Sequence, residues 1–221
     1  MPLPTPAAGV PAIPELGFAV RDAGVLERAA VPTLRLGLAV DAQGADVRSV
    51  VLDVQVQIAA RRRSYQRADP DRLFELFGAP AQWGTTLRTL PWTRTTVVVP
   101  PFRGTTEVDL HVPCTYDFEV LTARYLDALP DGDIPLELMF SGAVFYVEDS
   151  GRLQTARIGW DREAEFRLPV AVWRETMWHY FPQTGWLRLD RERLERLSAY
   201  KSRHALPSLD AAIDALLEGR E

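Results

Sequence analysis

Three ionisable side chains alternate along one stretch of the chain at the spacing that places them on one face of a β-strand. Glu107, Asp109 and His111 are two residues apart from one another, and side chains at i, i+2 and i+4 share a strand face. Two carboxylates and an imidazole could bind a divalent cation or transfer protons. The solvent face of a half-buried strand has the same pattern. We therefore assign no metal site and keep a metal-dependent hydrolase as an alternative function.

The single cysteine, Cys114, offers a second kind of chemistry. It follows Pro113 where a helix is expected to begin, and a helix N-terminus lowers the pKa of a thiol. His111 is close in sequence, so a cysteine-dependent hydrolase is the other catalytic alternative. Strand alternation, however, sends His111 to the solvent face, and free cysteines mostly behave as small buried hydrophobes. We assign no catalytic residue and no cofactor, and the sequence favours a binding protein over an enzyme.

A dense basic run follows one of the predicted strands and consists of Arg61, Arg62, Arg63, Tyr65 and Arg67. Arginines around a tyrosine could contact phosphates while the ring stacks on a base. The chain as a whole carries a net charge of −5, which disfavours nucleic acid as the partner. We predict that this run binds a protein partner or forms internal salt links.

Aromatic residues gather in the last third of the chain, where Trp173 and Trp178 stand five residues apart. On a helix that spacing points the two rings in different directions. One monomeric core cannot easily hold both, although core packing is the commoner fate of each. We therefore predict that one of them contacts a second subunit or a partner.

Alternating apolar residues predict strands through most of the chain, and the apolar–polar alternation is typical of antiparallel sheets with one wet face. The predicted strands cover residues 34–40, 47–58, 93–99, 105–112, 136–147, 153–159 and 166–170. Together with the helices below they predict an α+β fold, with six to eight antiparallel strands, helices packed on one side and a helical C-terminal segment.

Capping residues and 3.6-residue periodicity predict the helices. Asp69, Pro70 and Asp71 begin a helix that ends at Gly78, and Thr115 caps a second one. A third covers residues 171–181. The expected buried residues of the first helix are Leu73, Phe74, Leu76 and Phe77, and those of the second are Phe118, Leu121, Tyr125 and Leu129.

Two more helices are predicted near the C-terminus. Asp190 and Ser208 cap them, and Gly219 ends the last one. The apolar residues expected to be buried are Leu194, Leu197 and Tyr200 in one helix and Leu209, Ile213, Leu216 and Leu217 in the other.

Composition divides the chain into an arm and one domain. Five prolines in residues 1–14 predict a proline-rich arm over residues 1–30, partly disordered, followed by one α+β domain over 31–221 whose part 171–221 is helical. Hydrophobic residues make up 47% of the chain, enough for a large core. The start lacks a signal-peptide pattern and no stretch of about 18 apolar residues occurs. We expect a cytoplasmic protein that binds a protein partner or its own copies, and no membrane.

Two resemblances accompany these patterns. From about Leu34 to Leu217 the chain resembles an actinobacterial family of unknown function that is often encoded near uptake nickel–iron hydrogenase genes. The residues that carry this are Tyr116-Asp117, Gly132 to Leu136, Phe140-Ser141-Gly142, Phe145-Tyr146, Trp173 and Phe181-Pro182. The resemblance implies an accessory, adaptor-like role beside hydrogenase and supplies no catalytic residues.

The order of strands followed by Pro113-Cys114, a helix, then Ile134 to Leu136 and Phe145 is also similar to the export chaperone SecB. This second resemblance implies a related sheet-plus-helix layout. It adds an alternative function, a chaperone-like module that binds extended polypeptide.

Overall fold

A computed structural model describes residues 13–114, 121–148, 150–182 and 189–219. Contacts divide the chain into two compact units, Met1–Thr184 and Gly185–Glu221. The first unit holds one antiparallel sheet of seven strands, which confirms the predicted α+β class. The strands are β1 (Gly17–Val25), β2 (Thr33–Ile58), β3 (Leu90–Val99), β4 (Phe102–Pro113), β5 (Asp133–Val147), β6 (Leu153–Arg157) and β7 (Glu163–Pro169).

Strand β2 organises the sheet because it is 26 residues long and pairs with four other strands. Its first half lies between β1 and β4, and its second half lies between β3 and β5. The pairing with β4 shifts register between Asp41 and Asp46, and Gln43 and Gly44 there have positive φ. The strands predicted over 34–40 and 47–58 are thus two halves of one continuous strand.

The core is built from the alternating faces of both halves of β2. Leu34, Leu36 and Leu38 from the first half and Leu52 and Val54 from the second are all buried in one hydrophobic cluster. Because successive side chains of a strand point to opposite faces, this alternation leaves Asp53, Gln55 and Gln57 on the outer side.

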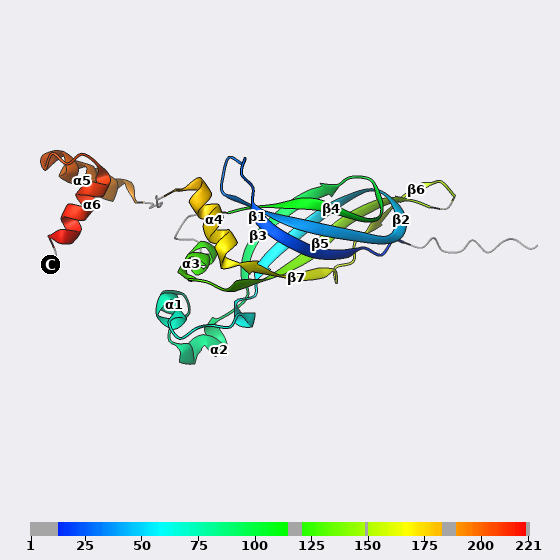
Figure 1. Ribbon diagram of the computed structural model, residues 1–221, viewed down its shortest axis with the longest axis horizontal. Helices are drawn as coiled ribbons and strands as arrows, with labels where there is room; N and C mark the ends of the chain where they lie inside the picture. The colour runs from blue at the N-terminus through cyan, green and yellow to red at the C-terminus, as the bar shows by residue number, and fades with distance from the viewer. Residues whose placement is uncertain (1–12, 115–120, 149, 183–188, 220–221) are drawn as a thin grey trace, which may run out of the picture. The chain divides into compact units, whose positions relative to one another are not determined.

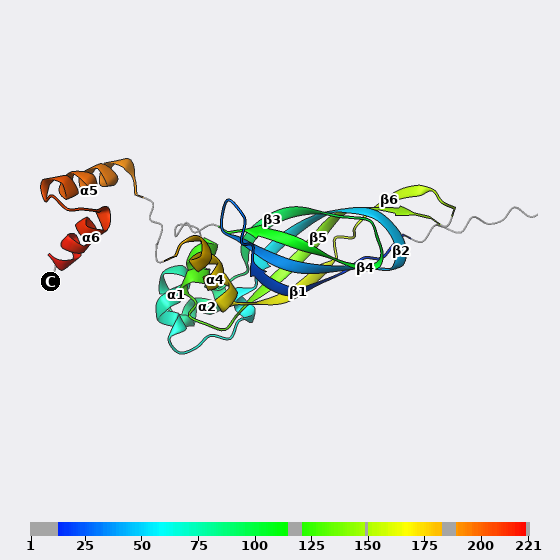
Figure 2. The same cartoon turned by 45° about the horizontal axis from the view of Figure 1, so that its top comes forward.

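The α-helices described in this unit are α1 (Asp69–Phe77), α2 (Trp83–Thr86), α3 (Leu121–Ala128) and α4 (Val170–Tyr180). Two short 3-10 helices cover Ala60–Arg62 and Pro80–Gln82. Both views place α1 to α4 at one end of the strands, with β6 at the other end (Figures 1 and 2). The helices therefore lie together at one end of the sheet.

The second unit is a pair of helices, α5 (Arg191–Arg203) and α6 (Leu209–Glu218). Both predicted caps are confirmed, since Asp190 accepts a hydrogen bond from the Arg193 amide and Ser208 accepts one from the Ala211 amide. The predicted burial is wrong. No residue of α5 is buried, Ala212 is the only buried residue of α6, and Leu194, Leu209, Leu216 and Leu217 are exposed.

Other differences from the predictions are local. Residues 17–25, part of the segment assigned to the N-terminal arm, form β1. In α1, Leu73 and Phe77 are buried as predicted, whereas Phe74 is 60% exposed. Thr115, Tyr116, Asp117 and Phe118 lie outside the described residues. No helix among the described residues is long and apolar enough to cross a membrane.

Candidate binding surfaces

The acidic face of β4 serves cross-strand pairing in this structure. Glu107, Asp109 and His111 all lie on the exposed face, and Asp109 accepts a hydrogen bond of 3.1 Å from Arg35 of β2. The same guanidinium lies 2.9 Å from Asp22 of β1, so one arginine joins three neighbouring strands. Within the described residues, no three His, Cys, Asp or Glu side chains gather closely enough to hold a metal ion. The geometry gives the metal-dependent alternative no support.

Cys114 lies in the core, and its thiol donates a hydrogen bond to the carbonyl oxygen of Val112. Its amide donates to the carbonyl of Pro32 at 2.7 Å, which fixes the backbone at the end of β4. Burial raises the pKa of the thiol to about 12. The thiolate is the nucleophilic form. At neutral pH this side chain is therefore a small buried hydrophobe.

The structure separates the members of the basic run. Arg61 donates to the carbonyl oxygens of Leu87 and Gly84 at 2.7 and 2.6 Å, and so fastens the loop before β3. Arg62 forms ion pairs with Glu165 of β7 and with Glu137 of β5. Arg67 is exposed and has no hydrogen bond or ion pair to any residue that the structure describes. These positions support internal salt links over a continuous phosphate-binding patch.

Arg63 is the centre of a buried polar cluster beside α1 and α3. Its guanidinium donates to the carbonyl oxygens of Asp131 and Asp133, and its Cζ lies 5.8 Å from the centre of the Tyr65 ring. The Tyr65 hydroxyl donates to the Ala60 carbonyl and lies 3.0 Å from the Tyr125 hydroxyl. Burial raises the pKa of both tyrosine hydroxyls. The cluster ties the turn before β5 to the segment before α1.

The two tryptophans of α4 have different surroundings. Trp173 is buried and packs edge-to-face against Trp92, with 6.1 Å between ring centres. Trp178, five residues later, is 64% exposed. The five-residue spacing points the two rings in different directions, as expected. The structure shows that Trp173 is the ring in the core and Trp178 the ring on the surface.

Hydrogen bonds fix the helix that carries Trp178. Arg174 donates to the carbonyl of Leu129 at 3.0 Å, next to the end of α3. Tyr180 donates to the carbonyl of Leu26 and accepts from the amide of Ala29, and His179 lies 3.2 Å from the carbonyl of Glu27. The C-terminal turn of α4 is thereby attached to the loop between β1 and β2. Trp178 is an exposed aromatic side chain on a rigid support.

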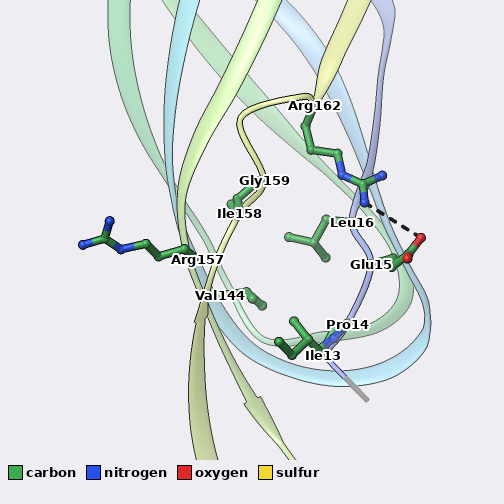
Figure 3. Close-up of a pocket in the computed structure, with 9 residues that line it drawn as sticks. All are labelled: Ile13, Pro14, Glu15, Leu16, Val144, Arg157, Ile158, Gly159 and Arg162. Atoms are coloured by element: carbon green, nitrogen blue, oxygen red, sulfur yellow. Dashed lines mark ion pairs between the residues drawn. The ribbon is translucent and has the colours of Figure 1, made fainter. Parts of the chain in front are cut away.

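A small cavity lies beside the N-terminal end of the described chain and measures about 220 Å³. Leu16, Val144 and Ile158 supply apolar walls, and Arg162 forms an ion pair of 3.8 Å with Glu15. Figure 3 shows Arg162 turned toward Glu15, whereas Arg157 points away from the hollow. Pockets for drug-sized ligands usually measure several hundred Å³, so this cavity is small for a substrate.

Comparison with known proteins assigns the chain to a family. The model of the Family of unknown function (DUF6084) matches residues 13–221. The chain belongs to DUF6084. No curated protein matches the sequence.

Among solved structures, the DUF6084 chain is similar to a protein assigned as ApaA from Bordetella pertussis, at 11% identity over 70% of this chain and 93% of that one, with a TM-score of 0.29. A late embryogenesis abundant protein has 15% identity, covers 71% of this chain and 73% of its own, and has a TM-score of 0.31. β-Glucosidase 3B from Thermotoga neapolitana has 11% identity over 70% and 17%, with a TM-score of 0.25. These scores are too low to indicate a common fold.

Sequence reasoning missed the residues that hold the exposed tryptophan of the DUF6084 chain in place. Tyr180 and His179 contact the loop at residues 26–29, more than 150 positions earlier in the sequence. A local sequence pattern cannot predict a contact over that separation. The available signal was the aromatic cluster at the end of the helix. It identified the region without identifying its partner loop.

Proposed function

We propose that this domain acts by binding another protein through a surface centred on Trp178. The observation that supports the proposal is a large aromatic side chain, 64% exposed, on a helix held by hydrogen bonds from its middle and from its C-terminal end. Tryptophan is enriched among the residues that dominate binding energy. A support that is rigid before binding reduces the entropy lost on association.

The surroundings of the ring are consistent with such an anchor. Arg174 and Glu175 are exposed on the preceding turn of α4, and His179 is exposed beside the ring. An apolar centre surrounded by charged and polar groups is the usual composition of a protein interface. We name this surface, made of Arg174, Glu175, Trp178 and His179, the α4 surface.

The two other kinds of function have weaker support. A chaperone needs a long apolar channel, whereas the exposed large apolar side chains of the sheet unit come from separate elements, such as Phe74 of α1, Val98 of β3 and Leu153 of β6. A cysteine-dependent hydrolase needs an accessible thiolate, and Cys114 is buried with a raised pKa. Binding through the α4 surface requires neither.

The resemblance to proteins encoded near uptake nickel–iron hydrogenase genes supplies the first partners to test, namely hydrogenase subunits and their assembly factors. The single free cysteine supports a cytoplasmic setting, where thiols stay reduced. The role that we propose is therefore that of a cytoplasmic accessory protein without a catalytic step of its own.

Replacement of the anchor tests the proposal. Tagged full-length protein carrying Trp178→Ala is expected to capture its stoichiometric partner from a native lysate at least about tenfold less well, because loss of a hot-spot tryptophan costs about 2–4 kcal/mol. Quantitative mass spectrometry measures the captured partner. The matched control is Trp160→Ala, which removes another ring, 91% exposed, between β6 and β7.

Equal melting temperatures for the two variants would show that the effect is not a folding defect. The proposal fails if the wild-type chain retains no partner at stoichiometric yield. It also fails if both tryptophan variants capture that partner equally.

A further inference from the structure

Several leucines of the α5–α6 hairpin are exposed on its surface. Ala212 is its one buried residue among those described, while Leu194, Leu216 and Leu217 are 43%, 44% and 64% exposed. Two helices of 13 and 10 residues are marginal in water unless an apolar face is packed against something. The hairpin therefore needs a partner for this face.

Leu216, one of these leucines, also lines a groove of about 700 Å³ between the two helices. Leu197 and Tyr200 of α5 and Leu216 of α6 form its apolar part. Arg193, Arg196 and Arg203 also line it, and together with Tyr200 they lie at i, i+3, i+7 and i+10. That spacing forms one stripe along a helix, so the groove combines an apolar base with a basic wall.

The two helices carry opposite charge. Helix α5 has five basic side chains against two acidic ones, whereas α6 has three acidic side chains and no basic one. The acids of α6 are Asp210, Asp214 and Glu218, spaced i, i+4 and i+8, so they form a single stripe beside Leu217. The apolar face is therefore flanked by a basic stripe on one helix and an acidic stripe on the other.

We propose that a second copy of the same chain occupies this face, so that two hairpins form an antiparallel four-helix bundle. In a two-fold symmetric pair, α5 of one copy faces α6 of the other and the reverse contact is identical. Each basic stripe then meets an acidic stripe of the other copy across the interface. The like-charged helices occupy the diagonals of the bundle, where they are farthest apart.

Charge distinguishes this partner from the other candidates. An acidic protein, a nucleic acid or an anionic membrane would attract α5, but the acidic stripe of α6 would repel it. A partner must present an acidic and a basic stripe in the complementary order. A second hairpin does so by symmetry, and it also supplies leucines for the apolar base.

Sedimentation equilibrium of the full-length protein is the primary test. The wild-type chain is expected to be a dimer at micromolar concentration, and Leu217→Lys is expected to raise its dissociation constant at least about tenfold, since each dimer buries two copies of the side chain. The matched control is Leu153→Lys in β6, because Leu153 is 63% exposed and Leu217 is 64% exposed. This control is expected to dimerise as the wild type does.

Complementary charge reversal tests the arrangement of the helices. Arg196→Glu with Arg203→Glu makes α5 acidic, and Asp214→Arg with Glu218→Arg makes α6 basic. Each double variant alone is expected to self-associate at least about tenfold more weakly. An equimolar mixture restores both α5–α6 contacts between chains, so a heterodimer is expected at near wild-type affinity. Circular dichroism of the mixture checks that the helices have formed.

A wild-type chain that stays monomeric at a protein concentration of about 0.1 mM would overturn the proposal, because its dimer would then dissociate with a constant above about 0.1 mM. So would a dimer unaffected by Leu217→Lys, or a charge-reversed pair that does not associate when mixed. None of these results bears on Trp178, which lies on α4 of the other unit, so partner capture and dimer formation are separate outcomes.

Discussion

At the scale of single residues, the protonation state of Cys114 decides whether its thiol can act as a nucleophile. The thiol pKa of about 12 is raised by burial, so the thiol stays protonated from neutral pH to about pH 11. At pH 8 an unfolded cysteine is about a quarter thiolate, whereas the native one is more than about a thousandfold less ionised.

Alkylation kinetics check this assignment. Iodoacetamide is expected to modify the native protein at pH 8 about a thousandfold more slowly than the guanidinium-unfolded chain, with a native rate that rises about tenfold per pH unit below pH 11. Mass spectrometry of timed samples measures both rates, and unfolded protein serves as the internal control. A native rate within tenfold of the unfolded rate would restore the cysteine-dependent alternative.

The basic run shows why a cluster in sequence need not be a cluster in space. Arg61 and Arg62 lie in a short 3-10 helix and Arg63 follows it directly, and the three side chains point in different directions. Arg61 reaches the loop before β3, Arg62 reaches the acids of β5 and β7, and Arg63 turns inward. The residue types were identified from the sequence, but their directions depend on carbonyl and carboxylate partners 20 to 100 positions away.

At the scale of elements, β5 contains a position where only glycine fits. Gly142 has a φ of +136°, and a Cβ there would lie 2.1 Å from the carbonyl oxygen of Val51 on β2. Its own carbonyl accepts a hydrogen bond from the amide of Ile158. A side chain would therefore push β5 away from the central strand.

Gly142→Ala is expected to lower the free energy of unfolding by at least about 3 kcal/mol, through the backbone clash and the strained φ. Urea denaturation followed by tryptophan fluorescence measures the change. The control is Gly84→Ala in α2, where a Cβ meets nothing within 4 Å and the change should stay within about 1 kcal/mol. Equal stability of the two variants would contradict the close approach of β5 and β2.

The strands that can be predicted from the sequence are those in which apolar and polar residues alternate strictly. Residues 34–40 and 47–58 alternate strictly because one face is in the core, and both were predicted as strands. Strand β1 was missed because Gly17–Val25 has no such alternation and most of it is only half-buried. Within the described part of the chain it pairs with β2 and no other strand, so its register is set by residues that a local pattern does not include.

At the scale of the whole molecule, each of the two units can be described by the residues that it buries itself. Among the described residues, the last member of the hydrophobic core cluster of the sheet unit is Met177. Burial of the hairpin leucines is expected from their amphipathic periodicity, because an apolar helix face packs against something. The periodicity does not identify the element or molecule that covers the face. The same periodicity is typical of a helix in a monomeric core and of a helix at an interface.

A chain ending at Thr184 is therefore expected to fold. Its melting temperature should lie within about 3 °C of that of the full-length chain, because every described residue of the core cluster is retained. Scanning calorimetry at low micromolar concentration measures both chains. A loss of cooperative melting in the shortened chain would mean that the hairpin is part of the same folding unit.

The length of β2 has a consequence for how the protein is made. A ribosome releases β2 early, and leucines and valines line one face of this strand. Strand β5, which pairs with the second half of β2, ends only at Val147. At roughly 5 to 20 residues per second, the strand waits on the order of ten seconds before that partner has been synthesised. During this interval one edge of the strand lacks its partner, and an unpaired edge with exposed apolar side chains makes the nascent chain prone to aggregation.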